Sequence, residues 1–372
     1  MHYFSQLRLT FFRNYEGLNV AFSPAVNCFS GKNGAGKTNI LDALHFLALT
    51  KGFRSSQDKQ AIKESEQFFF IEGHLQTEEK QQQIQCNYLQ GKTKKLLING
   101  TPLAKMSEHL GNIPLVAILP NDTALINEGA SERRKFLDSL ISQYSRPYLE
   151  SLIQYEKVLA QRNALLKLFG EKKFYDKEQL SLWDMQLIPL GQKLWAERQD
   201  FLQRFQPYFL HFFQRIVSEK EKPQLLYVSK IQENSTDEWE KLFQEHEWKD
   251  RINQTTSIGI HKDDIEFTIN EVSVKGFGSQ GQQKTFVIAL KLAQYELLRA
   301  HKTVNPILLL DDVFDKLDEF RLQQIADLLD KEMEGQVFIT DTSHQRLFQI
   351  FENSARKVAF FEVDAGNVSR YK

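Results

Sequence analysis

Alternating apolar and polar residues open the chain and predict a half-buried strand. Leu7, Leu9 and Phe11 alternate with Arg8 and Thr10, which is the period of two that a strand requires. Apolar residues at positions 20 and 22 predict a partner strand. A short apolar run over 25–29 then ends at a glycine-rich turn, and apolar residues between 40 and 48 follow at helical spacing. We therefore expect a strand, a glycine-rich turn and a helix in succession.

Strand-like alternation returns between residues 68 and 103. Ile84, Cys86 and Tyr88 alternate with polar neighbours, and Asn99-Gly100 is a strong hairpin signal. The pattern predicts an antiparallel sheet layered beside the first strand, turn and helix.

The middle of the chain has a helical pattern instead. From Ser131 to about residue 220 it is rich in Leu, Gln, Lys and Glu, and we expect Ser131 to cap the first helix. Pro189, Pro207 and Pro223 should separate later helices, and a short segment over 225–231 closes the region. The pattern predicts a mostly helical insertion.

Strand and helix patterns return after residue 254. Residues 264–269 alternate, 286–298 are apolar on nearly every side, and 307–310 form the continuous apolar run typical of a buried parallel strand. Further strands are expected over 337–340 and 358–363. We predict an α/β head with mixed sheets, formed by residues 1–130 and 255–372, and a helical lobe over 131–254.

Composition excludes several classes of protein. The 372 residues carry a formal net charge of −1, so the chain is not a globally basic nucleic-acid binder, although local basic patches remain possible. Hydrophobic residues at 41% and charged residues at 26% exclude a disordered chain. The sequence contains no apolar run of the roughly 18–20 residues that span a membrane. Its two cysteines form no CxxC pair, and we expect a cytoplasmic protein.

The glycine-rich turn has the pattern GxxxxGK[ST]. Its residues are Gly31, Lys32, Asn33, Gly34, Ala35, Gly36, Lys37 and Thr38. Glycines allow backbone N–H groups to surround a diphosphate, Lys37 reaches the β- and γ-phosphates, and the Thr38 hydroxyl joins the Mg²⁺ shell. The strand before the turn and the helix after it are in the required order. The motif therefore predicts binding of ATP with Mg²⁺.

The apolar run over 307–310 ends in two carboxylates, as a Walker B strand does. Asp311 is expected to hold the metal, directly or through water. Asp312 stands where many such ATPases have a glutamate that orients the attacking water, and its side chain is one methylene shorter. We predict Asp312 and Lys37 as the catalytic residues of a slow ATPase.

A glycine-containing segment stands directly before the buried helix over 286–298. Ser279, Gly281 and Gln282 within it are similar to the LSGGQ-type signature of ABC ATPases, with Gln280 replacing one glycine. A hydroxyl, glycines and a helix start together favour an anion site. We expect Ser279, Gly281 and Gln282 to contact nucleotide.

The chain resembles the RecF family of SMC/ABC-class ATPases over nearly its whole length. Besides the nucleotide motifs, the resemblance rests on Asn39, directly after the glycine-rich turn. It also rests on four further segments, 12–15, 52–54, 131–138 and 259–264. It implies an ABC-ATPase-type, SMC-like head with a short helical lobe. It further implies a homodimer closed by ATP, in which each copy gives its signature serine to the other copy's nucleotide.

The same resemblance implies a biological role. The dimer would bind DNA, with preference for single-strand/duplex junctions and gaps. It would act with RecO and RecR to load RecA in recombinational repair and replication restart, and would contribute to SOS induction.

Basic clusters supply the candidate DNA contacts. Arg133, Arg134 and Lys135 open the helical insertion, where they could meet phosphates. Their alternative role is a salt-bridge hub with Asp138 or neighbouring acids. A second cluster, of lysines at 92, 94 and 95, lies near the predicted hairpin. Either cluster could instead form an ordinary solvated face.

Three rival functions share some of these motifs. A transporter ATPase subunit has the same nucleotide motifs but no evident use for the helical insertion. A long SMC-type tether needs more residues than the insertion supplies, at about 1.5 Å per helical residue. An ATP-dependent nuclease needs a separate carboxylate cluster, and none is evident in the sequence.

Overall fold

The computed structural model describes residues 2–54, 57–78, 80–217, 221–315 and 317–371. Contacts divide the chain into two compact units. The first contains Met1–Asp122, Phe212–Ser218 and Lys284–Lys372, and the second contains Thr123–His211 and Glu219–Gln283. The predicted lobe ended at residue 254, whereas the second unit here extends to Gln283. Residues 264–269 belong to it because they form a strand that pairs with residues 223–228.

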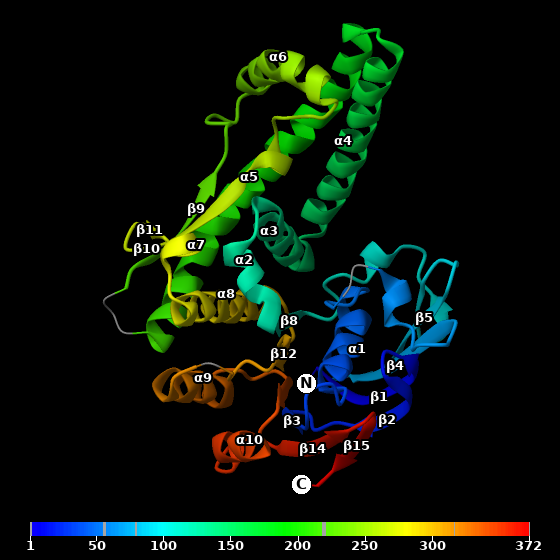
Figure 1. The fold of residues 1–372 in the computed structure, drawn as a ribbon, viewed down its shortest axis with the longest axis vertical. Coiled ribbons are helices and arrows are strands. Elements are labelled where there is room, and N and C mark those ends of the chain that lie inside the picture. The colour runs from blue at the N-terminus through cyan, green and yellow to red at the C-terminus, as the bar shows by residue number, and fades with distance from the viewer. Residues whose placement is uncertain (1, 55–56, 79, 218–220, 316, 372) are drawn as a thin grey trace. The chain divides into compact units, whose positions relative to one another are not determined.

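An antiparallel sheet forms one layer of the first unit (Figure 1), with strand order β2-β1-β4-β5-β6-β7. Its strands are β1 (Tyr3–Phe12), β2 (Tyr15–Ala21), β4 (Phe68–Gln76), β5 (Gln81–Leu89), β6 (Lys95–Ile98) and β7 (Thr101–Pro102). The predicted hairpin at Asn99-Gly100 is confirmed, because both residues have positive φ and join β6 to β7. The alternation predicted for β1 is wrong at its end. Phe11 has a φ of 51°, and Phe12 is the buried residue instead.

The second sheet of this unit is mainly parallel, with strand order β15-β14-β3-β13-β12-β8. Its strands are β3 (Val26–Ser30), β8 (Leu115–Ile118), β12 (Ile307–Asp311), β13 (Val337–Asp341), β14 (Val358–Asp364) and β15 (Asn367–Arg370). Only β15 pairs in antiparallel fashion, at one edge. The run over 307–310, predicted as a buried parallel strand, is confirmed as β12, and the strands expected over 337–340 and 358–363 are confirmed as β13 and β14.

Helix α1 (Lys37–Leu49) contacts strands of both sheets. All its residues except Thr38 are buried. One core cluster joins α1 residues such as Leu44 to Leu7 of the antiparallel sheet and Phe338 of the parallel sheet. The glycine-rich turn thus leads into a helix that packs against both the antiparallel and the parallel sheet, and this packing fixes the position of the turn.

The remaining helices of the first unit follow the parallel strands. They are α9 (Glu319–Lys331) and α10 (His344–Phe351), with short 3₁₀ turns η1 (Asp58–Ala61), η2 (Met106–Glu108) and η3 (Pro120–Thr123) elsewhere. Helix α8 (Gln280–His301) has its first four residues in the second unit and the rest in the first.

The second unit is mostly helical, as predicted. Its elements are α2 (Ala124–Asn127), α3 (Ala130–Tyr144), α4 (Arg146–Lys172), most of α5 (Lys177–Ile216), β9 (Pro223–Val228), α6 (Thr236–Asn253), η4 (Ile260–Lys262), β10 (Asp264–Ile269), β11 (Val272–Ser273) and α7 (Val274–Phe277). Strand β10 lies between β11 and β9.

Two details of the helical prediction are wrong. Gly129, and not Ser131, precedes α3, so Ser131 lies inside the first turn. Pro189 and Pro207 lie within α5 rather than between helices. A proline removes one backbone donor, and the 40-residue helix continues through both positions despite that loss.

Candidate functional site

The glycine-rich turn connects the carboxyl end of β3 to the start of α1. Gly31 has a φ of 155°, and a Cβ there would lie 2.2 Å from the Val363 carbonyl oxygen. Gly36 has a φ of 120°, and a Cβ there would lie 2.7 Å from the Tyr15 hydroxyl. Both positions therefore require glycine for conformation and for space. Lys32, Asn33 and Gly34 are exposed at the tip, and Ala35 is buried.

Lys37 lies across this turn. Its Nζ donates to the carbonyl oxygens of Gly31, at 2.7 Å, and Lys32, at 3.1 Å. No described side chain caps α1, and its first turn contains no acidic residue. The N–H groups of that turn and the positive end of the helix dipole therefore favour an anion. Lys37 adds a full positive charge to the same place.

Thr38, the residue after Lys37, connects the glycine-rich turn to the Walker B strand β12 through a hydrogen bond. Thr38 Oγ1 donates to Asp311 Oδ1 at 2.8 Å, and Thr340 Oγ1 donates to the same oxygen at 2.7 Å. Asp311 is buried at the end of β12, and Thr340 lies on the adjacent strand β13. A hydroxyl oxygen and a carboxylate oxygen, both of which are ligands suited to Mg²⁺, are thus adjacent beside Lys37.

Asp312 follows the strand in a left-handed conformation, with a φ of 46°. Its backbone N–H donates to the carbonyl and hydroxyl oxygens of Thr340, which holds this conformation. Burial raises the pKa of the Asp312 carboxyl, the negative charge of Asp311 raises it further, and Lys37 opposes both effects. A carboxylate with a raised pKa is a stronger base than an exposed aspartate.

Asn14, in the turn between β1 and β2, and Tyr15, the first residue of β2, hold the glycine-rich turn from the side. Asn14 Nδ2 donates to the Ala35 carbonyl at 3.0 Å, and the Tyr15 hydroxyl donates to the Gly36 carbonyl at 3.1 Å. Asn39 Nδ2 donates to Asn14 Oδ1 at 2.7 Å. The residue types of Asn14 and Tyr15 do not predict these contacts, because each residue lies 21 positions before its partner in the turn. Only the family resemblance had singled out their segment.

The signature segment lies at the start of α8 and in the second unit. Ser279 Oγ accepts from the Gln282 N–H at 3.2 Å, and Gln282 Oε1 accepts from the Ser279 N–H at 2.9 Å. This reciprocal pair is a capping box. Ser279 is exposed, and Gly281 is partly buried. The capping box presents the serine at a helix N-terminus facing solvent.

The basic cluster on α3 divides into residues with different surroundings. Arg133 is buried and donates to both carboxylate oxygens of Asp264, at 2.7 and 2.9 Å. Its Nη1 also donates to the carbonyls of Leu125 and Glu128. Arg134 Nη1 donates to the Asp263 carbonyl. This geometry favours the structural alternative for Arg133, although the carboxylate partner is Asp264 and not Asp138.

Lys135 and Asp138 have separate partners. Lys135 is exposed and pairs with Glu132 one turn away, at 2.6 Å. Asp138 pairs with the buried Arg198, at 2.8 Å. Lys135 is therefore the member of the cluster that solvent reaches most freely. No group of three or more His, Cys, Asp or Glu among the described residues could hold a metal ion.

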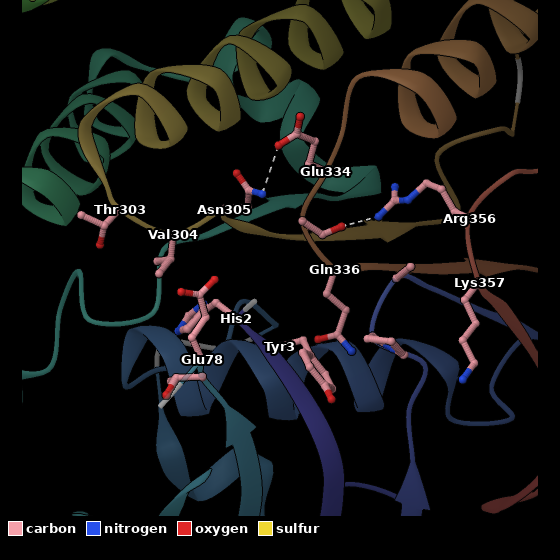
Figure 2. A pocket seen from close by; sticks show the side chains of 14 residues that line it. His2, Tyr3, Glu78, Thr303, Val304, Asn305, Glu334, Gln336, Arg356 and Lys357 are labelled. Carbon is pink, nitrogen blue, oxygen red and sulfur yellow. Dashed lines mark hydrogen bonds between the residues drawn. The ribbon is translucent and has the colours of Figure 1, made fainter. Parts of the chain in front are cut away.

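A separate cavity of about 650 Å³ lies at the amino ends of the parallel strands, away from the glycine-rich turn at their carboxyl ends. Figure 2 shows its lining, which includes Gln336 and Lys357 directly before β13 and β14. Glu78 and Glu334 oppose the cations of Arg356 and Lys357, and the two Arg356 Nη atoms donate to backbone carbonyls. This mixed lining favours neither an anion nor a cation.

Comparison with known proteins identifies the family. Residues 3–366 match the model of the RecF/RecN/SMC N-terminal domain. The DNA replication and repair protein RecF of Flavobacterium johnsoniae is 44% identical, with 96% of this chain and 99% of that protein covered. RecF of Cytophaga hutchinsonii is 39% identical, with 99% and 97% covered. The chain belongs to the RecF family.

Solved structures agree with this assignment. A structure described as the recombination mediator protein RecF with ATP, in the RecFOR pathway, aligns with a TM-score of 0.89 at 28% identity. It covers 100% of this chain and 98% of that chain. An Smc head from Pyrococcus furiosus aligns with a TM-score of 0.58 at 17% identity, which shows a shared SMC-like fold. The RecF family is a family of DNA replication and repair proteins. None of the helices described here is long and apolar enough to cross a membrane.

Proposed function

We propose that this chain is an ATP-dependent DNA-binding protein of recombinational repair and replication restart. The observation that carries the proposal is the contact between Thr38 and Asp311 beside Lys37, at the open start of α1. Glycines 31, 34 and 36, the N–H groups of the turn and Asn39 would surround the phosphates. The RecF–ATP structure supports ATP as the nucleotide.

The donor set fits Mg²⁺. Thr38 and Asp311 would hold the ion, which coordinates a few protein oxygens together with phosphate oxygens and water. The bound ion would neutralise charge on the phosphates. Thr340 keeps the Asp311 carboxylate in position, and Asp312 accepts a proton from the attacking water. The raised pKa of Asp312 supports this role, and its short side chain predicts slow hydrolysis.

Ser279, Gly281 and Gln282 act on the nucleotide of a second copy. Support comes from the exposure of Ser279 at the start of α8, where the capping box fixes it. The γ-phosphate would join the two copies, because the helix start and the hydroxyl both favour an anion. ADP lacks that phosphate and leaves the copies apart.

DNA and three proteins complete the proposal. The ATP-bound dimer binds DNA at gaps and single-strand/duplex junctions, and acts with RecO and RecR in loading RecA and in SOS induction. Membership of a DNA replication and repair family supports the DNA role. Lys135 and Arg134 remain candidate phosphate contacts, and Arg133 acts by positioning α3.

Sedimentation with ATP, with ADP and without nucleotide tests the proposal. We expect a dimer with MgATP, and a monomer with ADP or without nucleotide. Gapped DNA should tighten ATP binding, because two ligands that both bind the dimer stabilise it together. Ser279→Arg should bind ATP as a monomer, and Asp312→Asn should retain the closed dimer. A mixture of Lys37→Ala and Ser279→Arg should regain partial ATPase activity, since one composite site is intact. Heterodimers without any activity would refute transfer of Ser279 between copies.

A further inference from the structure

Aromatic side chains lie on the solvent-facing side of the antiparallel sheet. The register places Phe70 of β4 between Thr10 of β1 and Asn87 of β5. In the next row Phe68 lies opposite Leu89. Residues two apart share a face of a strand, so Phe68 and Phe70 lie together, while Phe69 between them is buried in the core.

These residues line a groove of about 540 Å³. Its lining consists of Thr10, Phe68, Phe69, Phe70, Asn87, Tyr88, Leu89, Lys92, Thr93 and Lys95. Phe68 is 39% exposed and Leu89 46% exposed. Such exposed apolar residues on one face indicate a binding surface rather than scattered surface residues. The rings of Phe11 and Phe68 pack edge to face, with centroids 5.2 Å apart, and this contact restrains the Phe68 ring.

The lysine run beside the groove has two roles. Lys94 pairs with Asp58 at 2.6 Å and lies over the Phe46 ring, so it acts in packing. Lys92 and Lys95 are exposed and line the groove. The register places Lys95 opposite Asn87, in the same row as Phe70. Two exposed lysines therefore line the same groove as the aromatic residues.

The lining residues include no carboxylate. Glu72, one row further along β4, is buried and accepts from Gln83 and Gln85 at 2.8 and 2.7 Å. Arg8 lies 3.5 Å from its carboxylate and compensates its charge. The groove thus combines aromatic faces with positive charge only, which complements a polyanion whose units carry flat rings.

We propose that this groove binds single-stranded DNA, with unpaired bases stacked on Phe68 and Phe70 and phosphates beside Lys92 and Lys95. This combination of stacking and cations is general to single-strand binding. Bases in a duplex are already stacked and paired, so the groove selects unpaired nucleotides. The inference rests on the proposed DNA-binding function and adds the place where a single strand is recognised.

Fluorescence anisotropy of the full chain with a labelled oligothymidylate tests the inference. Phe68→Ala should weaken binding about tenfold. Replacing both Lys92 and Lys95 with Gln should lower the salt slope by about 1.4, since each single-strand phosphate contact contributes about 0.7. Phe320→Ala is the matched control, because Phe320 is 62% exposed on α9, far from the groove in the chain. It should leave the affinity unchanged.

Two further measurements separate the possible outcomes. Phe68→Ala should still dimerise with ATP in sedimentation and should still retain blunt duplex DNA. If the unmodified chain itself shows neither behaviour, the proposed function is refuted. Cross-linking of the unmodified protein to a bromodeoxyuridine-containing strand should label the peptide with residues 68–70, even if a variant folds poorly. Unchanged oligothymidylate affinity in Phe68→Ala, or cross-links elsewhere only, would overturn the inference and favour a protein partner for this face.

Discussion

The starts of helices α1 and α3 both carry basic side chains that the sequence associates with phosphates, but the structure gives them different partners. Lys37 donates to two backbone carbonyls of its own turn. Arg133 donates to both oxygens of a carboxylate and to two further carbonyls. A phosphate can replace neutral carbonyls at little cost, whereas a guanidinium–carboxylate pair is lost only at high cost. The partner of a cation, more than its presence in a motif, therefore indicates its role.

The largest effect should come from removing the structural arginine. We expect Arg133→Ala to lower the free energy of unfolding by on the order of 3 kcal/mol, because Asp264 and two carbonyls lose their donor. Asp264 keeps partial solvent contact, so the loss should fall at the low end for buried pairs. Urea unfolding measures it, with Lys135→Ala as the control on the same helix. If Arg133→Ala lowers the free energy of unfolding by less than Lys135→Ala does, Arg133 does not have the structural role assigned to it.

Removing the phosphate-facing lysine should act on ligand rather than on stability. Lys37→Ala should weaken ATP binding roughly a hundredfold, or about 2.7 kcal/mol, because charge-assisted hydrogen bonds to phosphate are lost. Isothermal titration calorimetry with MgATP measures the affinity. Arg133→Lys, if folded, should bind ATP normally. Equal ATP affinity in Lys37→Ala and the unmodified chain would contradict the assignment of the site.

Asp312, beside the nucleotide site at the start of α1, should make the free energy of unfolding depend on pH. Its folded pKa is raised by burial and by Asp311, so the ionised carboxylate destabilises the fold once the pH exceeds that pKa. Asp312→Asn should therefore increase the free energy of unfolding at neutral pH. The gain should decline as the pH falls from the raised pKa toward the ordinary pKa of an aspartate, and should disappear below it, where Asp312 is protonated in both the folded and the unfolded chain. Urea unfolding without nucleotide at several pH values measures the difference, and a gain that grows toward acid pH would reverse the predicted sign.

The smallest effect should come from the exposed member of the α3 cluster. Lys135 pairs with Glu132 within one helix turn, and such surface pairs contribute less than about 0.5 kcal/mol. Lys135→Ala should barely change stability, but should lower the salt slope of duplex binding by about 0.9 if one phosphate contact is lost. Filter retention over a salt series measures the slope. An unchanged slope would leave Lys135 as an ordinary surface residue.

Local patterns predicted the strands around the glycine-rich turn and the Walker B strand because their signals are short-range, but they gave no prediction for β8, α10 or β15. Strand β12 is a continuous apolar run up to Asp311, and Gly31 and Gly36 are required by positive φ and close contacts. The contact of Thr38 with Asp311 spans 273 positions, and two motifs together made it predictable. The hydrogen bonds of Asn14 and Tyr15 to the turn could not be predicted, because neither residue type specifies such a partner.

Predictions failed where distant packing decides the outcome. Burial of Phe12 instead of Phe11 follows from one left-handed residue that no periodicity reveals. Pro189 and Pro207 lie within α5 although proline disfavours a helix interior locally. The pairing of Arg133 with Asp264 links residues 131 positions apart, so a local cluster of charges could not distinguish a salt bridge from a DNA contact.

Thermal unfolding with and without MgATP, on Lys37→Ala and Arg133→Ala side by side, tests the contrast between the two regions most directly. A ligand that binds only the folded state raises the midpoint. The account predicts that Lys37→Ala keeps the midpoint of the unmodified chain without nucleotide but loses the rise with MgATP. It predicts that Arg133→Ala unfolds at lower temperature yet keeps that rise. The opposite pattern, with a full MgATP rise in Lys37→Ala and an unchanged midpoint in Arg133→Ala, would contradict it.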